Sequence, residues 1–227
     1  MKDNATKPSL DGKQINAIIF DMDGTLSDSI DAYFDVFNQA AATVGLKFER
    51  EEVLCCLANQ INIWEKLFPD DLPEREQIIR KISIATKEIY TKTIQKVKLF
   101  PNLEQVLKKL KDNDIKMGVV TASSRESLTP LYNNRLEHYF EVMISWEDDY
   151  PRKPAPDSII ACLKRMNADA KKSIVVGDTL ADIIAGREGG TLTVGVLSGM
   201  ASRDMLEREK PTAIIDWVGD IPALLGI

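Results

Sequence analysis

Short, uninterrupted apolar runs recur along the chain and predict the strands of a parallel sheet. They cover residues 17–20, 117–120, 142–144, 174–176, 192–196 and 213–215, of which 142–144 and 213–215 are the shortest candidates. Strands buried on both faces have this pattern, because helices cover both sides of a parallel sheet. Amphipathic helical segments alternate with the runs, for example at residues 103–111. This alternation predicts a doubly wound, mainly parallel α/β sheet with a Rossmann-like core.

Between the first two apolar runs the alternation is interrupted, and helical spacing dominates. One apolar stripe consists of Tyr33, Phe37, Ala40, Ala41 and Val44, and a second, after Pro73, consists of Ile78, Ile82, Ala85 and Ile89. Gly45 directly follows the first stripe and is well suited to end its helix. We therefore expect a small helical cap, residues 28–97, inserted after the first strand of a core made of residues 1–27 and 98–227.

Composition and charge narrow the class of protein. With 44% hydrophobic and 28% charged residues in 227, the chain has the balance of an ordinary globular protein. A net charge of −6 argues against nucleic acid as the main partner, since nucleic-acid phosphates require a basic face. The chain has neither an apolar signal segment at its start nor a run long enough to span a membrane. We expect a cytoplasmic monomer or homodimer that acts on a small molecule.

Chemically useful side chains follow the ends of the predicted strands. They are Asp21 and Asp23 after the first run, Thr121 and Ala122 after the second, Lys153 on the loop after 142–144, and Asp178 and Asp182 after 174–176. The carboxyl ends of parallel strands lie at one edge of a sheet, where ligands bind. Four acids, a hydroxyl and a lysine can therefore converge there.

Such a group is suited to metal-assisted phosphoryl transfer. Carboxylates crowded together repel one another unless a cation neutralises them, and oxygen ligands without Cys or His select a hard cation such as Mg²⁺. A carboxylate such as Asp21 can form an aspartyl-phosphate, while a second acid such as Asp23 transfers protons. Thr121 and Lys153 can supply the positioning and positive charge that phosphoryl transfer requires.

Together these segments resemble the four motifs of the haloacid dehalogenase superfamily, in the same order, from Ile18 onward. They are residues 21–26, Thr121, Lys153, and 177–179 with Asp182. The resemblance implies that Asp21 is the nucleophile and Asp23 the general acid/base, and that Thr121, Ala122 and Lys153 bind the phosphate. It also implies a Mg²⁺ site made by Asp21, the main-chain carbonyl of Asp23, Asp178 and, as a further residue of the metal shell, Asp182. The helical insert resembles the mobile cap of the family.

Within the superfamily the chain is most similar to phosphoglycolate phosphatase-like proteins, since residues 153–157 and 194–199 are typical of that group. Asp23 favours phosphate-ester chemistry, because members that cleave carbon–halogen or phosphonate bonds usually lack this acid. Two departures stand out: residues 56–62 contain no glycine where the group often has one, and Arg152 occupies a position where glycine is common. Arg125 is a further candidate to reach the phosphate.

The resemblance implies a magnesium-dependent phosphatase that hydrolyses a small phosphate monoester, phosphoglycolate being the leading candidate. A sugar-phosphate mutase of the β-phosphoglucomutase type shares both active-site acids and is the main alternative. A non-catalytic protein that binds a phosphorylated ligand is a second alternative, although such a protein would be expected to lose one of the acids. A dinucleotide-binding enzyme is disfavoured, because no Gly-x-Gly-x-x-Gly follows the first strand.

Overall fold

The computed structural model describes residue 10 and residues 14–59, 61–68 and 74–227; most of the polar N-terminal tail, and Pro73, lie outside the described residues. A six-stranded parallel sheet in the order β5-β4-β1-β6-β7-β8 confirms the six apolar runs. Its strands are β1 (Ala17–Phe20), β4 (Lys116–Val120), β5 (Val142–Ile144), β6 (Ser173–Gly177), β7 (Leu192–Val196) and β8 (Ala213–Ile215). The predicted doubly wound α/β fold is therefore correct.

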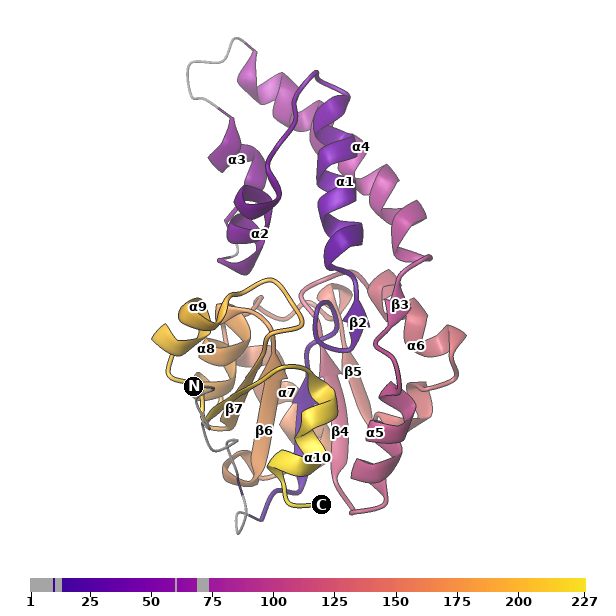
Figure 1. The fold of residues 1–227 in the computed structure, drawn as a ribbon, viewed down its shortest axis with the longest axis vertical. Coiled ribbons are helices and arrows are strands. Elements are labelled where there is room, and N and C mark those ends of the chain that lie inside the picture. The colour runs from indigo at the N-terminus through magenta and orange to yellow at the C-terminus, as the bar shows by residue number, and fades with distance from the viewer. Residues whose placement is uncertain (1–9, 11–13, 60, 69–73) are drawn as a thin grey trace, which may run out of the picture.

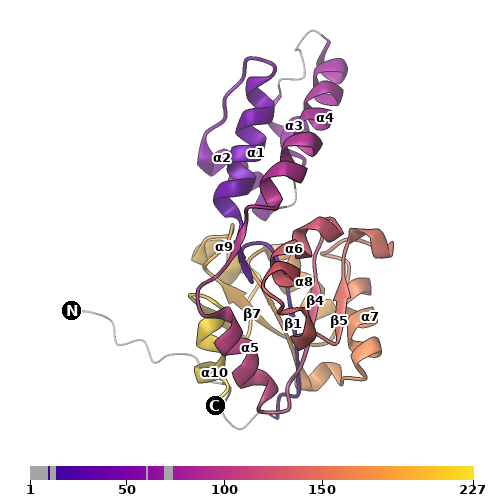
Figure 2. The ribbon, with the colours of Figure 1, turned by 90° about the vertical axis from the view of Figure 1, so that its right-hand side faces the viewer.

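Alternate residues of the central strand face opposite sides of the sheet. Ile18 and Phe20 belong to one apolar cluster, with residues of α5 (Leu103–Lys111), α6 (Thr129–Asn133) and α10 (Ile221–Leu224). Ala17 and Ile19 belong to the other, with residues of α7 (Asp157–Met166) and α8 (Leu180–Glu188). Figure 2 shows α5 and α10 on one side of the strands and α7 on the other. Both faces are covered, which explains why the strands are uninterrupted apolar runs.

Four helices form the cap above the carboxyl ends of the strands (Figure 1). They are α1 (Ile30–Ala42), α2 (Arg50–Ala58), α3 (Ile63–Leu67) and α4 (Arg75–Ile94). Their buried side chains form a separate cluster that includes Ala40, Ala41, Phe48, Val53, Trp64 and Ile82. A short antiparallel ribbon of β2 (Ser27–Asp28) and β3 (Lys98–Leu99) joins the cap to the sheet.

The end of α1 follows directly from the sequence. The Gly45 N–H donates to the Ala42 carbonyl and the Leu46 N–H donates to the Ala41 carbonyl, both at 3.1 Å. These two bonds form a Schellman motif, which requires a left-handed residue at the position of Gly45. Gly45 has φ +77° and an open environment, so glycine is selected here by backbone conformation alone.

Two contacts seat the cap on the core. Ala58, at the end of α2, is fully buried in a cluster with Ile183 and Leu206 of the core. On the opposite side, the Thr91 hydroxyl of α4 donates to Glu126 at 3.4 Å. The cap therefore contacts the core at separate places.

The remaining elements are short. They are α9 (Arg203–Arg208) and the 3₁₀ helices η1 (Arg125–Leu128), η2 (Glu137–Tyr139), η3 (Trp146–Asp148), η4 (Ala170–Lys172) and η5 (Val218–Asp220). Among the described helices, none combines the length and the apolar character that crossing a membrane requires.

Candidate active site

A pocket of about 470 Å³ lies between the cap and the carboxyl ends of β1, β4 and β6. All seven residues predicted from the sequence line it, namely Asp21, Asp23, Thr121, Ala122, Lys153, Asp178 and Asp182. The cap contributes Tyr33, Leu57, Ile61 and Asn62 to the same lining. Residues from loops far apart in the sequence thus meet around one pocket, as expected at the carboxyl edge of a parallel sheet.

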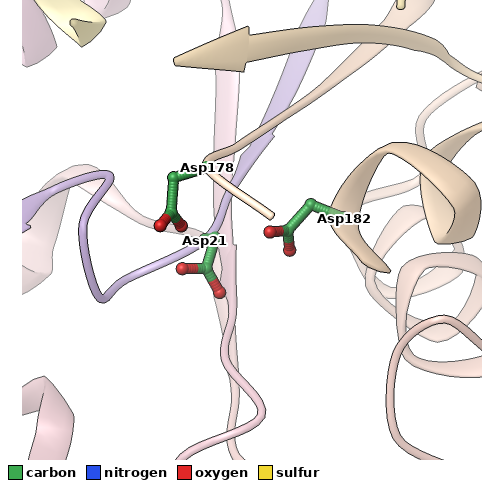
Figure 3. Close-up of side chains that lie close together, drawn as sticks. All are labelled: Asp21, Asp178 and Asp182. Atoms are coloured by element: carbon green, nitrogen blue, oxygen red, sulfur yellow. The ribbon is translucent and has the colours of Figure 1, made fainter. Parts of the chain in front are cut away.

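Three carboxylates converge at the floor of the pocket (Figure 3). One oxygen each of Asp21, Asp178 and Asp182 lies within 4.8 Å of the others, and all three residues are buried. Burial, opposed by the Lys153 charge, raises the pKa of Asp21 to about 7. Burial and the neighbouring charges of Asp21 and Asp182 raise the pKa of Asp178 well above its ordinary value. This crowding is electrostatically unfavourable unless positive charge offsets it.

Lys153 supplies part of that positive charge. Its ammonium donates to Asp21 Oδ1 at 2.5 Å, to Asp182 Oδ1 at 2.5 Å and to the Val120 carbonyl at 2.9 Å. Burial lowers the pKa of Lys153, but the charges of Asp182 and Asp21 outweigh burial and raise this pKa above its ordinary value. The lysine therefore stays charged, and its three N–H groups are all engaged.

The start of helix α8 orients Asp182. The Asp182 Oδ2 atom accepts hydrogen bonds from the Thr179 N–H at 3.0 Å and from the Thr179 hydroxyl at 2.5 Å. The Thr179 hydroxyl oxygen in turn accepts the Asp182 N–H at 3.4 Å, which completes a capping box. Because Oδ2 caps the helix and Oδ1 accepts a hydrogen bond from Lys153, both oxygens of the Asp182 carboxylate are held in position.

Asp178 is held by the loop after β7. Its Oδ2 accepts the Met200 N–H at 2.7 Å, and its Oδ1 accepts the Thr25 hydroxyl at 3.4 Å. A Cβ atom at Gly199 would overlap this carboxylate, so only glycine fits beside it. The loop that follows β7 thus sets where the Asp178 oxygens lie.

The side chain of Asp23 lies outside the group of three carboxylates. Its Oδ2 accepts hydrogen bonds from the Ser123 hydroxyl at 2.9 Å and from the Tyr33 hydroxyl at 3.0 Å. Its Oδ1 is buried and has no partner among the described residues. Burial raises the pKa of Asp23, while the bonds from Ser123 and Tyr33 lower it. A buried carboxyl with a free oxygen at a pocket wall is suited to proton transfer.

Thr121 and Ala122 lie where β4 ends. Thr121 is buried, its N–H donates to the Ile144 carbonyl at 3.0 Å, and its hydroxyl oxygen accepts the Ser123 N–H at 3.0 Å. Ala122, which follows Thr121, is half-buried and lines the pocket. The Thr121 hydroxyl therefore helps to fix the conformation of the loop after β4.

Several lining residues were missed by the sequence reasoning. The helical spacing of Tyr33 predicts a place in the apolar stripe of α1. In the structure its hydroxyl contacts Asp23 and lies 2.8 Å from the Ser123 hydroxyl. The run of hydroxyl residues after Thr121 was the available signal for Ser123. Arg125, a candidate from the sequence to bind the phosphate, is not part of the pocket lining. Its Nη2 atom instead lies 3.4 Å from Asp148 Oδ2.

The donor set fits a hard divalent cation. Among the described residues, the three converging groups are carboxylates, and no His or Cys belongs to the cluster. Oxygen-only sites of this kind suit Mg²⁺ rather than Zn²⁺ or copper. Burial first, and then the charges of neighbouring carboxylates, raise the pKa of Asp21 and of Asp178, so a cation bound beside them would favour their charged forms.

Comparisons with known proteins extend these observations. The family model of haloacid dehalogenase-like hydrolases matches residues 18–196. Pyrophosphatase PpaX of Bacillus pumilus is 26% identical over 215 residues, covering 93% of this chain and 97% of its own. PpaX of Anoxybacillus flavithermus is also 26% identical, with 94% and 98% covered. A solved structure described as a predicted phosphoglycolate phosphatase from Haemophilus somnus is similar in fold, with a TM-score of 0.80, 23% identity, and 93% and 98% covered.

Proposed function

Because the chain belongs to the haloacid dehalogenase-like hydrolase family and is a phosphatase of that family, we propose that it is magnesium-dependent and hydrolyses a small phosphate monoester through an aspartyl-phosphate. The observation that carries the proposal is the position of Asp21. Its carboxylate lies at the end of the central strand, beside Lys153 at 2.5 Å and within the buried carboxylate group. A nucleophile, a cation and metal ligands are thus available in one pocket.

In the proposed first step, a carboxylate oxygen of Asp21 attacks the phosphorus. A bond forms between this oxygen and phosphorus, and the bond from phosphorus to the leaving oxygen breaks. Asp23 donates a proton to that oxygen, so the product leaves as a neutral alcohol. Asp23 lines the pocket, and its Oδ1 has no hydrogen-bond partner among the described residues, which supports this role.

In the second step, Asp23 accepts a proton from water, and the resulting hydroxide attacks the phosphorus. The bond between phosphorus and the Asp21 oxygen breaks, which releases inorganic phosphate and restores the carboxylate. We assign the binding of the phosphoryl oxygens to the Thr121 hydroxyl, the Ala122 main chain and the positive charge of Lys153.

Asp21, Asp178 and Asp182, together with the main-chain carbonyl of Asp23, would hold the magnesium ion. A bound divalent cation reduces the repulsion between a carboxylate and an approaching phosphate. The crowding of three buried carboxylates supports this assignment, because a cation there would offset their mutual repulsion.

We further propose that residues 28–97 form a cap over a core of residues 1–27 and 98–227. The ribbon of β2 and β3 supports this division, because β2 spans the first proposed boundary and β3 begins at the second. The three cysteines are unpaired, which supports a reducing, cytoplasmic location. The proposed partner is a small phosphorylated metabolite, rather than nucleic acid or a membrane, and the proposed assembly is a monomer or homodimer.

The direct test measures phosphate release from a panel of small phosphomonoesters by the purified protein. We expect release in Mg²⁺, loss of release in chelator and recovery when Mg²⁺ is restored. The Asp21→Asn variant should fold normally and lose nearly all turnover, because covalent catalysis is removed. Undiminished release by Asp21→Asn, or full activity in chelator after dialysis, would contradict the mechanism.

A mutase is tested in the same assay with glucose 1-phosphate, with and without a sugar bisphosphate. A phosphatase releases phosphate and needs no bisphosphate, whereas a mutase transfers the phosphoryl group from Asp21 to a second sugar phosphate. Rapid isomerisation with little phosphate released would replace the hydrolase assignment and leave the nucleophile in place.

A further inference from the structure

Arg152 is a cation at the pocket whose charge the proposed chemistry does not use. The pocket lining contains four aspartates against one lysine and one arginine, a formal excess of two negative charges. Lys153 is committed to Asp21, Asp182 and the Val120 carbonyl. Arg152 makes no ion pair with any residue that the structure describes. Arg152 is therefore the positive residue of the lining whose charge remains available to a ligand.

An aromatic side chain holds this guanidinium in place. The Arg152 Cζ atom lies 4.5 Å from the centroid of the Trp146 ring, which is a cation–π distance. Stacking covers a face of the planar guanidinium and leaves its N–H groups free at the edge, where they can bind carboxylate or phosphate oxygens in pairs. Trp146 itself is 56% exposed, an unusual position for a large aromatic residue unless it has a partner.

The Trp146 platform is fixed to the catalytic loops. The Trp146 N–H donates to the Ser123 carbonyl at 3.0 Å, and Ser123 contacts Asp23. A capping box formed by Ser145 and Asp148 determines the turn of η3 that carries Trp146. Arg152 then lies directly before Lys153 in the chain. The guanidinium is thus held by elements that also position the proposed acid/base and the phosphate-binding lysine.

A substrate with two anionic groups needs such a cation. In the proposed reaction, the metal ion and Lys153 offset the charge of the reacting phosphoryl group and of the surrounding carboxylates. A second anion in the same pocket would otherwise face four aspartates, and like charges at short range are costly. A monoester with a neutral leaving group places no such demand on Arg152.

We propose that Arg152, stacked on Trp146, binds a second anionic group of the substrate, so that the enzyme prefers phosphate compounds carrying an adjacent carboxylate or second phosphate. The proposal rests on the phosphatase function and adds to it a specificity-determining residue. Both kinds of anion present oxygen pairs to the guanidinium, and the experiment separates them.

The experiment compares the wild type with Arg152→Gln on three substrates: phosphoglycolate, pyrophosphate and 2-hydroxyethyl phosphate. The last replaces the carboxylate of phosphoglycolate by a neutral hydroxyl. We expect kcat/KM for one or both dianionic substrates to fall about 10- to 100-fold, mainly through KM, as for the loss of a charged hydrogen bond. The loss with 2-hydroxyethyl phosphate should be several-fold smaller, and the larger of the other two losses identifies the natural anion.

Two further variants separate recognition from structure. Arg152→Lys keeps the charge but loses the planar pair of donors, so we expect a partial loss with the same substrate preference. Trp146→Leu removes the stacking partner and should cause a smaller loss in the same direction. Arg208→Gln is the matched control, since Arg208 is an exposed arginine at the end of α9 and lies outside the pocket lining. It should leave all three activities unchanged.

Equal losses on all three substrates, or no loss on any, would overturn the proposal while leaving the phosphatase function intact. If the wild type hydrolysed none of them, the proposed function would be at fault for these compounds. Binding of phosphoglycolate and pyrophosphate to Asp21→Asn, measured by calorimetry with Mg²⁺, would then decide. Weaker binding when Arg152→Gln is added supports the proposal, and unchanged or undetectable binding refutes it.

Discussion

Tyr33 joins the cap to the acid that we propose for proton transfer. Its hydroxyl lies 3.0 Å from Asp23 Oδ2, 2.8 Å from the Ser123 hydroxyl and 3.5 Å from the Tyr90 hydroxyl. Tyr33 and Tyr90 belong to α1 and α4 of the cap, whereas Ser123 belongs to the core. The orientation of Asp23 therefore depends on hydroxyls from both parts of the molecule.

We predict that Tyr33→Phe lowers kcat/KM, which reports the leaving-group step, about 10-fold for alkyl phosphates, because Asp23 loses a hydrogen bond that orients it. The loss should be smaller for 4-nitrophenyl phosphate, whose leaving group departs without needing a proton. Steady-state rates with both substrates check the prediction. Tyr132→Phe, at an exposed tyrosine of α6, is the control. Equal losses with both leaving groups would indicate a structural role for Tyr33.

The three thiols should differ in reactivity. Burial raises the pKa of Cys162 to about 12, so this thiol stays protonated at neutral pH, and the side chain is fully buried against the sheet. Cys55 is exposed. Because the thiolate is the reactive form, we predict that iodoacetamide at pH 8 modifies Cys55 well before Cys162. Mass spectrometry of peptides measures the order, and early modification of Cys162 in the folded protein would contradict this packing.

At the scale of elements, the loop after β7 determines the position of Asp178, which lies after β6. A side chain at Gly199 would overlap the Asp178 carboxylate, whose Oδ2 also accepts the Met200 N–H at 2.7 Å. We predict that Gly199→Ala displaces this carboxylate and raises the Mg²⁺ concentration needed for half-maximal activity about 10-fold or more. A magnesium titration of phosphate release measures the change.

Gly45→Ala is the matched control for that variant. It introduces a Cβ atom where nothing lies within 4 Å, at a residue with φ +77°. The expected cost is about 1 kcal/mol of unfolding free energy from backbone strain, with an unchanged magnesium requirement. If Gly45→Ala shifted the magnesium titration as much as Gly199→Ala does, the effect would be one of general stability and not of loop position.

For the molecule as a whole, burial and then the charges of neighbouring carboxylates disfavour the charged forms of Asp21 and Asp178 in the folded state. We predict that Mg²⁺ raises the melting temperature, by about 5–10 °C when its concentration is 100-fold above Kd, since it binds the folded state. Asp178→Asn should raise the melting temperature without metal, because a neutral amide is less costly to bury than a carboxylate and does not repel Asp21 and Asp182, and should reduce the magnesium shift. Calorimetric scans measure both effects. A lower melting temperature of metal-free Asp178→Asn would show that its hydrogen bonds outweigh the repulsion.

The pattern of apolar residues was sufficient to predict the layers of the fold and the loops that carry chemistry. Strands buried on both faces must be apolar throughout, so the six runs could be recognised without knowing their partners. Asp21, Thr121 and Asp178 follow such runs, and the shared direction of parallel strands brings them to one edge. The end of α1 at Gly45 was also predictable, since it depends on local backbone conformation.

Which side chains from the cap and the outer loops reach the site depends on how the folded elements pack together. Tyr33 has the helical spacing of a core residue, and its contact with Asp23 depends on how the cap sits on the core. Arg125 and Arg152 could not be distinguished from sequence. One pairs with Asp148 away from the pocket, whereas the other stacks on Trp146 at its edge. Hydrophobic periodicity reports burial within an element, and the direction of a polar group toward a distant partner is determined only when the elements pack.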